Sequence, residues 1–234
     1  MPAHKARANR NWGALLVEKE VRDSIRDGTG LRYRIGPDYV LADEPYKAER
    51  YFDWFCREFP DDTGEPIHLL YRAIERFNRN DIEAASRHLK DAMLSNLYLL
   101  PQLIKQPIAR LDIWHGSNWH EPEYLQEVAE YLTQPTSEQR EWMHERYETA
   151  SFRELRTEYI RAHKVLLAER DIARRGHVLD KLATFVAANR SSPVRVMAKE
   201  LRNNNLNTLS FDPTIRGWIK RHSSKPSSRS CRIA

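Results

Sequence analysis

The stretch that decides the fold is RAIERFNRNDIEAASRHLKDAM, residues 72–93. Its apolar residues recur every three or four positions on both sides of a polar turn at 78–81, which is the spacing of two amphipathic helices. In the second helix Ala85, Leu89 and Ala92 share one face, and charged residues occupy the opposite face. The segment therefore predicts a helical hairpin.

The same pattern occurs earlier in the chain, at a spacing of 37 residues. Six positions correspond: Tyr33, Gly36, Val40, Ala48, Phe52 and Phe55 match Leu70, Ala73, Phe77, Ala85, Leu89 and Ala92. A repeat of this length is typical of stacked helical hairpins, because a single hairpin cannot bury its apolar face alone. We expect helices at 31–41 and 46–59 in the first copy, and two more within 67–96.

On these residues, the range 30–96 resembles a tetratricopeptide-type repeat protein. Ala73 and Ala85 stand at the small positions of the two helices in the second copy. Members of this family are mostly binding scaffolds, so the resemblance implies that a protein or peptide binds a concave face. By the same resemblance, Ile74 and Asn78 would line that face.

Two prolines depart from the repeat pattern. Pro45 suits the first turn of a helix, whereas Pro37 removes a hydrogen bond and should shorten or kink the helix that contains it. The linker at 60–66 is rich in turn-forming residues. We expect its acidic residues, Asp61, Asp62 and Glu65, to form an exposed turn.

The sequence on either side of the repeat predicts further helices. A leading helix is expected at 12–27, preceded by basic residues that we expect to be frayed and solvated. The apolar but proline-interrupted stretch at 97–122 should pack over the hairpins as an irregular cap. A short helix is expected at 123–132, and one or two long helices between 137 and 176, where no glycine or proline intervenes.

The C-terminal region has a different pattern, with three short apolar helices expected at 177–189, 193–203 and 212–222. The polar and basic tail that follows is expected to be disordered. We therefore divide the chain into a hairpin part with its cap, a connecting helical part, a basic three-helix part and a tail: 1–135, 136–176, 177–222 and 223–234.

Residues 194–222 resemble a helix-turn-helix, in which the second helix would begin near Phe211. The resemblance implies contact with DNA or another polyanion, because exposed Lys and Arg neutralise phosphates. Six basic residues are the candidates: Arg195, Lys199, Arg202, Arg216, Lys220 and Arg221. The turn at 203–210 is longer than is usual for this motif, and a basic, solvated three-helix bundle is the alternative.

Charge is distributed unevenly along the chain. Residues 1–150 hold 20 Lys/Arg and 26 Asp/Glu, a net charge of −6, whereas residues 151–234 hold 18 and 7, a net charge of +11. The two parts should therefore have different partners, and the basic part should favour anionic ones.

The sequence also indicates the compartment of the protein. It has two cysteines, Cys56 and Cys231, no apolar signal sequence and no stretch long enough to span a membrane. We expect a soluble, cytoplasmic protein in a reducing environment. The last four residues, Cys231 to Ala234, fit the outline of a prenylation motif, although coincidence in a polar tail is the simpler interpretation.

One cluster could support chemistry. Trp114, His115, Trp119, His120 and Glu121 lie within eight residues, and His and Glu are common metal ligands and proton carriers. No paired helical spacing supports a metal, so we favour a loop anchored by its tryptophans. No phosphate-binding glycine loop or nucleophile motif occurs in the sequence, and we expect no cofactor.

These patterns predict an all-α protein that acts as a non-catalytic scaffold or adaptor. The alternative function is a DNA-binding regulator that uses the basic C-terminal part. A third hypothesis, an enzyme with its site around His115 and His120, has less support.

Overall fold

The computed structural model describes residues 2–189 of the chain, and this part is all-α, with eleven α-helices, one short 3-10 helix (η1) and no strand. The elements are α1 (Pro2–Arg22), α2 (Arg32–Leu41), α3 (Pro45–Glu58), α4 (Pro66–Asn78), α5 (Ile82–Ser95), α6 (Leu99–Leu103), η1 (Asn118–His120), α7 (Tyr124–Glu127), α8 (Ala129–Leu132), α9 (Ser137–Tyr147), α10 (Ala150–Ala168) and α11 (Ile172–Asn189). No helix among the described residues is long and apolar enough to cross a membrane.

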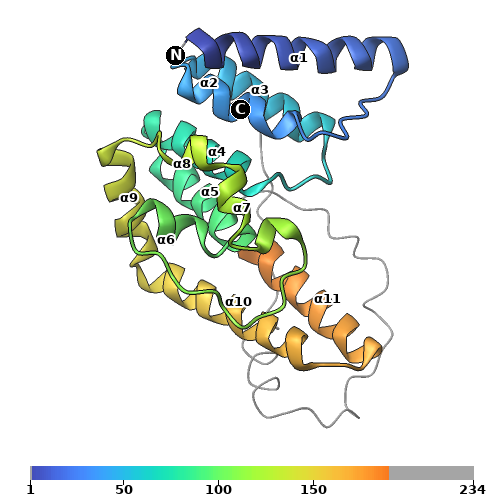
Figure 1. The fold of residues 1–234 in the computed structure, drawn as a ribbon, viewed down its shortest axis with the longest axis vertical. Helices are drawn as coiled ribbons and strands as arrows, with labels where there is room; N and C mark the ends of the chain where they lie inside the picture. Colours follow the sequence, from blue (N-terminus) through green and yellow to red (C-terminus); the bar gives the residue numbers. More distant parts are fainter. Residues whose placement is uncertain (1, 190–234) are drawn as a thin grey trace.

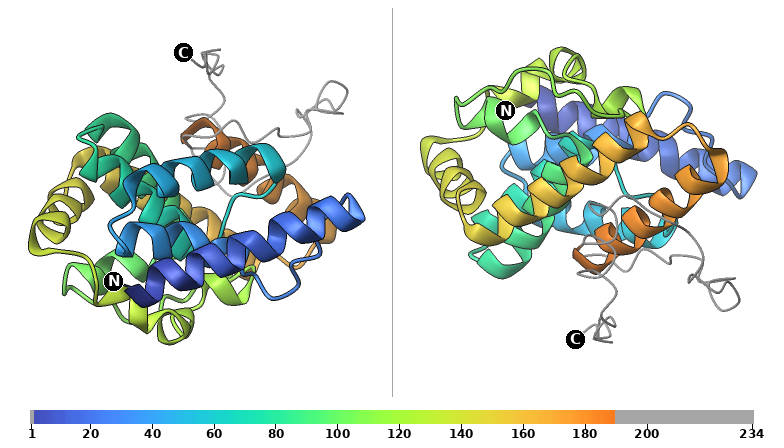
Figure 2. Two further views of the ribbon diagram at one scale, coloured as in Figure 1. Left: turned by 90° about the horizontal axis from the view of Figure 1, so that it is seen from above. Right: turned by 90° about the horizontal axis from the view of Figure 1, so that it is seen from below.

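The helices form two groups along the long axis of the molecule: α1 to α3 at one end, and the helices from α4 onward at the other (Figure 1). The first group is α1, α2 and α3, in which α2 packs against both of its neighbours. Helix α2 also packs on α4, and α4 pairs closely with α5. Helices α10 and α11 pack on α5, and α9 packs on α6 and α10 (Figure 2).

The four helices expected from the repeat are present, with closely matching ends. Proline begins both α3 and α4, and the side chain of Asp81 caps α5 by accepting a hydrogen bond from the backbone N–H of Ala84 at 3.1 Å. The side chains at Ala48, Phe52, Ala85, Leu89 and Ala92 are fully buried. The apolar spacing therefore identified the core correctly.

Gly36 is required by close packing between α2 and α3. A Cβ atom at this position would lie 2.6 Å from the ring of Phe52, a contact that real Cβ atoms essentially never make. Pro37 follows it inside α2, which continues to Leu41. The expected shortening at Pro37 does not occur. The missing N–H removes one hydrogen bond from α2, and this residue lies in a segment that is buried against the rest of the protein.

Three other expectations differ from the structure. The basic N-terminus is helical from Pro2, since its side chains bind α2, and so it is not a frayed end. The expected boundary between 176 and 177 falls inside α11, which runs through Gly176. Glu65 is buried and not part of an exposed turn, because its Oε1 accepts a hydrogen bond from Arg34 at 2.7 Å.

The irregular stretch after α5 lies over the hairpins, as expected of a cap. The side-chain amide of Asn96 donates to the backbone carbonyls of Trp119 and Glu121, at 2.7 and 3.1 Å. Further along, the hydroxyl of Tyr124 accepts a hydrogen bond from the backbone N–H of Ile67 in α4. Side chains at both ends of the cap therefore satisfy buried backbone groups.

Replacing Ala85 with arginine should unfold the hairpin of α4 and α5, because the site is fully buried and a buried unpaired charge costs about 3–5 kcal/mol. Urea unfolding of the purified chain measures the loss. Ala183→Arg is the matched control, since Ala183 is an exposed helical position. Equal unfolding midpoints for the two variants would contradict the close packing at Ala85.

Candidate functional site

The face of α4 that was expected to bind a partner is only partly open: Ile74 is buried, whereas Asn78 is exposed. Ile74 is 1% exposed, and the side chain of Asn78 accepts a hydrogen bond from Gln139 of α9 at 2.8 Å. Beside them, the rings of Phe77 and Trp142 stack with centroids 4.6 Å apart. Ile74 therefore cannot line an open groove, and α9 contacts the end of α4 next to it through Asn78 and Phe77.

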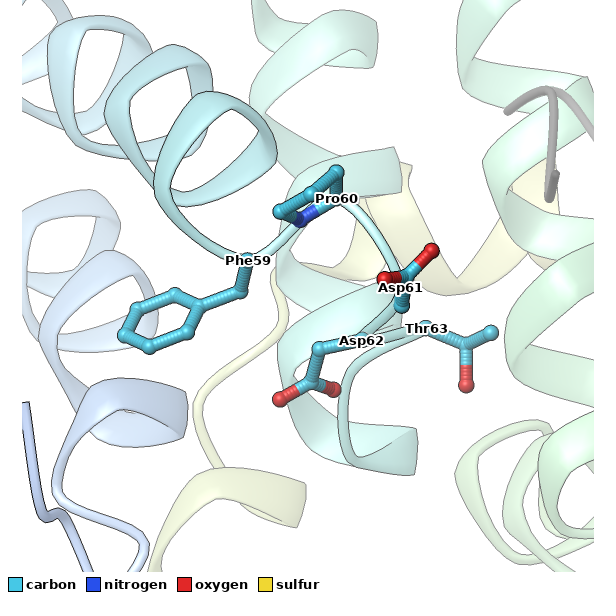
Figure 3. Close-up of a pocket in the computed structure, with 5 residues that line it drawn as sticks. All are labelled: Phe59, Pro60, Asp61, Asp62 and Thr63. Carbon is cyan, nitrogen blue, oxygen red and sulfur yellow. The ribbon is translucent and has the colours of Figure 1, made fainter.

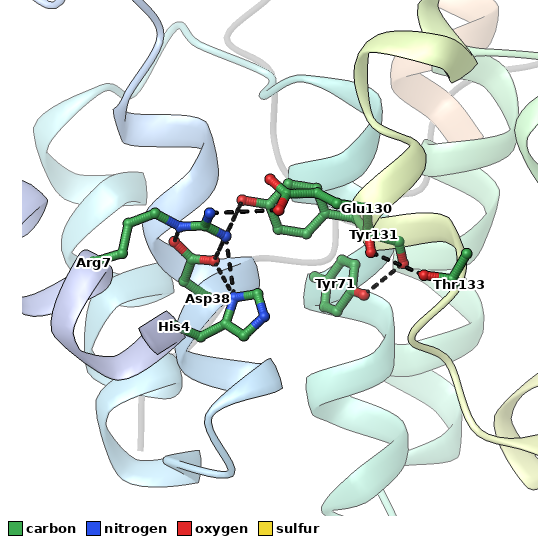
Figure 4. Close-up of polar contacts among 7 residues, drawn as sticks. All are labelled: His4, Arg7, Asp38, Tyr71, Glu130, Tyr131 and Thr133. Atoms are coloured by element: carbon green, nitrogen blue, oxygen red, sulfur yellow. Dashed lines mark hydrogen bonds and ion pairs between the residues drawn. The ribbon is translucent and has the colours of Figure 1, made fainter. Parts of the chain in front are cut away.

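A buried polar cluster joins α1, α2 and α8 (Figure 4). Asp38 of α2 is 0% exposed, and its carboxylate accepts two hydrogen bonds from Arg7, at 2.6 and 2.5 Å. His4 lies 2.8 Å from the same carboxylate, and the Tyr131 hydroxyl donates to it at 3.3 Å. Arg7 and Tyr131 thus donate three hydrogen bonds to one buried carboxylate, which His4 also contacts.

The electrostatics of this cluster favour a structural role. The hydrogen bond to Asp38 raises the pKa of Arg7 above its usual value, so the guanidinium is permanently charged. Burial, with the Asp38 charge, raises the pKa of the Tyr131 hydroxyl. Because Asp38 has no exposed surface and its carboxylate already accepts three hydrogen bonds, it is not available to a substrate. The cluster fastens α1 to the body of the protein.

A second buried polar group is His68, enclosed by the rings of four aromatic residues: Tyr33, Tyr51, Phe52 and Phe55. Neither ring nitrogen makes a hydrogen bond of normal geometry with the described residues, although the backbone of Tyr33 is near enough to favour the charged form. Burial, reinforced by the Arg72 charge, lowers the pKa of His68 to about 3. The imidazole is therefore neutral at physiological pH.

The loop with paired tryptophans and histidines also gains a partner from α10. His163 contacts the Trp114 carbonyl through Nδ1 at 2.7 Å, and its Nε2 is buried without a hydrogen bond in the described structure. His115 lies 3.0 Å from the Tyr98 hydroxyl, and His120 accepts a hydrogen bond from the backbone at 3.2 Å.

The space enclosed by this loop and α10 is small. The cavity that the three histidines help to line measures about 10 Å³, room for roughly one water molecule. No group of histidine, cysteine or carboxylate side chains among the described residues could hold a metal ion. The observed contacts agree with a loop anchored by its rings.

The acidic linker borders an open surface hollow of about 460 Å³, lined by residues 59–63 (Figure 3). Asp62 accepts hydrogen bonds from the Tyr33 hydroxyl at 2.7 Å and from Arg32 Nε at 2.9 Å. Its other carboxylate oxygen accepts from the backbone N–H of Gly64. Asp62 is thus engaged in holding the linker against α2.

Some predicted residues cannot be placed. The six candidate DNA-binding residues and Cys231 all lie beyond residue 189, outside the described part of the chain. Asp38, His68 and His163 were not identified from the sequence. The partners of Asp38 on α1 lie about thirty positions away, so no local spacing indicates the contact.

Comparison with known proteins identifies no relative: no family model, curated protein or solved structure matches the chain.

Replacing Asp38 with asparagine should leave Arg7 without its counter-ion and destabilise the fold by about 3 kcal/mol. Glu130→Gln is the matched control, because Glu130 lies 3.4 Å from the same guanidinium but is exposed, and its loss should cost less than about 1 kcal/mol. Urea unfolding and hydrogen exchange of the α1 amides provide the measurements. Unchanged protection of α1 in Asp38→Asn would show that the pair does not hold this helix.

Lowering the pH should destabilise the protein through His68. Its folded-state pKa of about 3 lies below the unfolded value of 6.5, so the unfolded chain takes up the proton first. Stability is therefore full above pH 6.5 and falls as the pH approaches 3, with a loss of about 3 kcal/mol at pH 4.

His68→Phe should reduce the difference in unfolding free energy between pH 7 and pH 4 by that amount, whereas His144→Gln, at an exposed position, should not change it. Chemical denaturation at both pH values tests this. The same difference in His68→Phe as in the parent would exclude His68 as the titrating group.

Proposed function

We propose that this protein is a non-catalytic scaffold that binds another protein, and that α1 presents a binding surface. The observation that supports this is an apolar stripe on the outer face of α1. Val17 is 60% exposed and Val21 is 74% exposed, with the exposed Ala14 one turn before them and Leu16 at the edge. These positions share one helical face, opposite the buried Leu15.

The stripe belongs to a helix that is held firmly. Arg7 and His4 bind Asp38, while the Trp12 ring makes edge contacts with Tyr39 and Tyr51 at centroid distances of 5.8 and 5.4 Å. Near the other end of α1, Lys19 pairs with Glu58 of α3.

The end of α1 that carries the valines reaches past α2 and α3 (Figures 1 and 2). A rigid, projecting helix with apolar side chains on its outer face is suited to docking, because little conformational entropy is lost on binding. The basic C-terminal part would add a second, anionic partner. The surface offered to a protein partner is therefore α1, rather than the covered face of α4.

Replacing Val17 and Val21 together with glutamate should weaken capture of the partner at least about tenfold, since burial of each valine contributes about 1.5 kcal/mol. The measurement is affinity capture by the full chain, with quantitative mass spectrometry. Circular dichroism should show an unchanged melting midpoint, because both side chains are exposed.

The matched control is Ala3→Glu with Ala6→Glu, which places two carboxylates on exposed positions of the same helix. It should retain the captured proteins. Identical capture by the parent, the valine variant and the control would contradict a binding role for this stripe. Light scattering on the same samples reports whether the captured partner is a second copy of the chain.

A further inference from the structure

The outer face of α1 carries residues at the spacing of a coiled-coil seam. Four of them follow one another at intervals of three, four and three: Arg10, Gly13, Val17 and Glu20. This spacing keeps them on one side of the helix, opposite the buried Leu15, and it is the spacing through which two helices pack along their length. We call these four residues the α1 seam. The side chains of its arginine, valine and glutamate are exposed.

The glycine of the α1 seam has no role in the packing of the chain itself. A Cβ atom at Gly13 would meet no neighbouring group within 4 Å. Glycine in the interior of a helix is destabilising relative to alanine, and Gly13 lies in the middle of a helix of 21 residues. Where a side chain is missing, the backbone can be approached closely. Gly13 therefore leaves room on the outer face of α1 for a large side chain of another helix.

The two charged residues of the α1 seam lack ionic partners. Among residues 2–189, no side chain forms an ion pair or a hydrogen bond with the side chain of Arg10 or Glu20. These two residues cannot pair with each other, because ten residues of α-helix separate them by about 15 Å. A helix that complements the seam must therefore place a negative group opposite Arg10 and a positive group opposite Glu20.

A second copy of α1 that runs antiparallel to the first meets all of these requirements. In an antiparallel pair of helices whose middles coincide at Leu15, Arg10 lies opposite Glu20 of the second copy. In the same alignment, Gly13 lies opposite Val17 of the second copy. Each contact occurs twice, because the pair has a two-fold axis. The α1 seam is thus complementary to itself in both charge and size.

We propose that α1 associates with α1 of a second copy of this chain, as an antiparallel helix pair joined through the α1 seam. This inference rests on the proposed function of α1 as a binding surface, and it names the partner of that surface. Leu16, which is 42% exposed, lies beside the two-fold axis and packs against Leu16 of the second copy. Because α1 ends at Arg22, Ala3 and Ala6 extend past the end of the second helix and take no part in the contact.

Charge reversal within the α1 seam tests the pairing in the full chain, by sedimentation velocity at low salt over a wide range of protein concentration. Arg10→Glu and Glu20→Arg each bring like charges together, so each variant should dimerise at least about tenfold more weakly than the parent. An equimolar mixture of the two variants brings opposite charges together again and should restore association. Arg153→Glu makes the same change at an exposed position of α10 and is the matched control.

Gly13→Gln tests the close approach of the two helices separately from their charges. In the single chain the added side chain has open space, so the melting midpoint should not fall. In the pair it should displace Val17 of the second copy and weaken dimerisation at least about tenfold.

Three results would overturn the proposal. The first is a parent chain that remains monomeric at the highest concentration, and the second is equal weakening in Arg10→Glu and Arg153→Glu. The third is a mixture of the two seam variants that associates no better than either variant alone. If one of these results occurs and the variant with glutamate at Val17 and Val21 still loses partner capture, α1 keeps its binding role and only a second copy is excluded as its partner.

Discussion

The ion pair between the buried Asp38 carboxylate and Arg7 is the interaction on which the arrangement of the N-terminal helices depends. The carboxylate lies inside α2 with no exposed surface, its charge is compensated by Arg7 of α1, and His4 lies 2.8 Å from it. Such a group is stable inside a protein only when its partners are in place, because desolvation of an unpaired carboxylate costs several kcal/mol. The need to neutralise Asp38 therefore orders α1, and the Tyr131 hydroxyl extends the same constraint to α8.

The position of α1 affects which apolar surfaces of the protein stay exposed. In an array of helical hairpins, the surface that binds a partner is the one that later elements leave open. Here Ile74 of α4 is buried, α9 contacts Phe77 and Asn78 at the end of the helix, and the hydroxyl of Tyr71 donates to the carbonyl of Tyr131 at 2.8 Å. Exposed apolar side chains remain on α1, at Val17 and Val21, and the Asp38 cluster holds this helix in place.

The polar side chains on the remaining faces of α4 differ in whether they have an ion-pair or hydrogen-bond partner. Arg76 and Arg79 are paired with carboxylates of α3, and Asn78 is bound by α9. His68 is held as a neutral ring among aromatic side chains. The Nε atom of Arg72 is buried without a hydrogen bond in the described part of the chain.

The amino-acid sequence alone predicted the all-α class, the four helices between residues 31 and 96 and many of their buried positions, because these follow from apolar spacing within single helices. Only the tertiary structure decided the order of the N-terminus, the burial of Glu65 and Ile74, and the placement of Asp38, His68, His163 and Arg72. Each of these depends on a partner many residues away, such as Arg7 for Asp38 or Gln139 for Asn78. Local periodicity reports which face of a helix is apolar, but it does not report which distant segment covers that face, and burial and pairing are set by that segment.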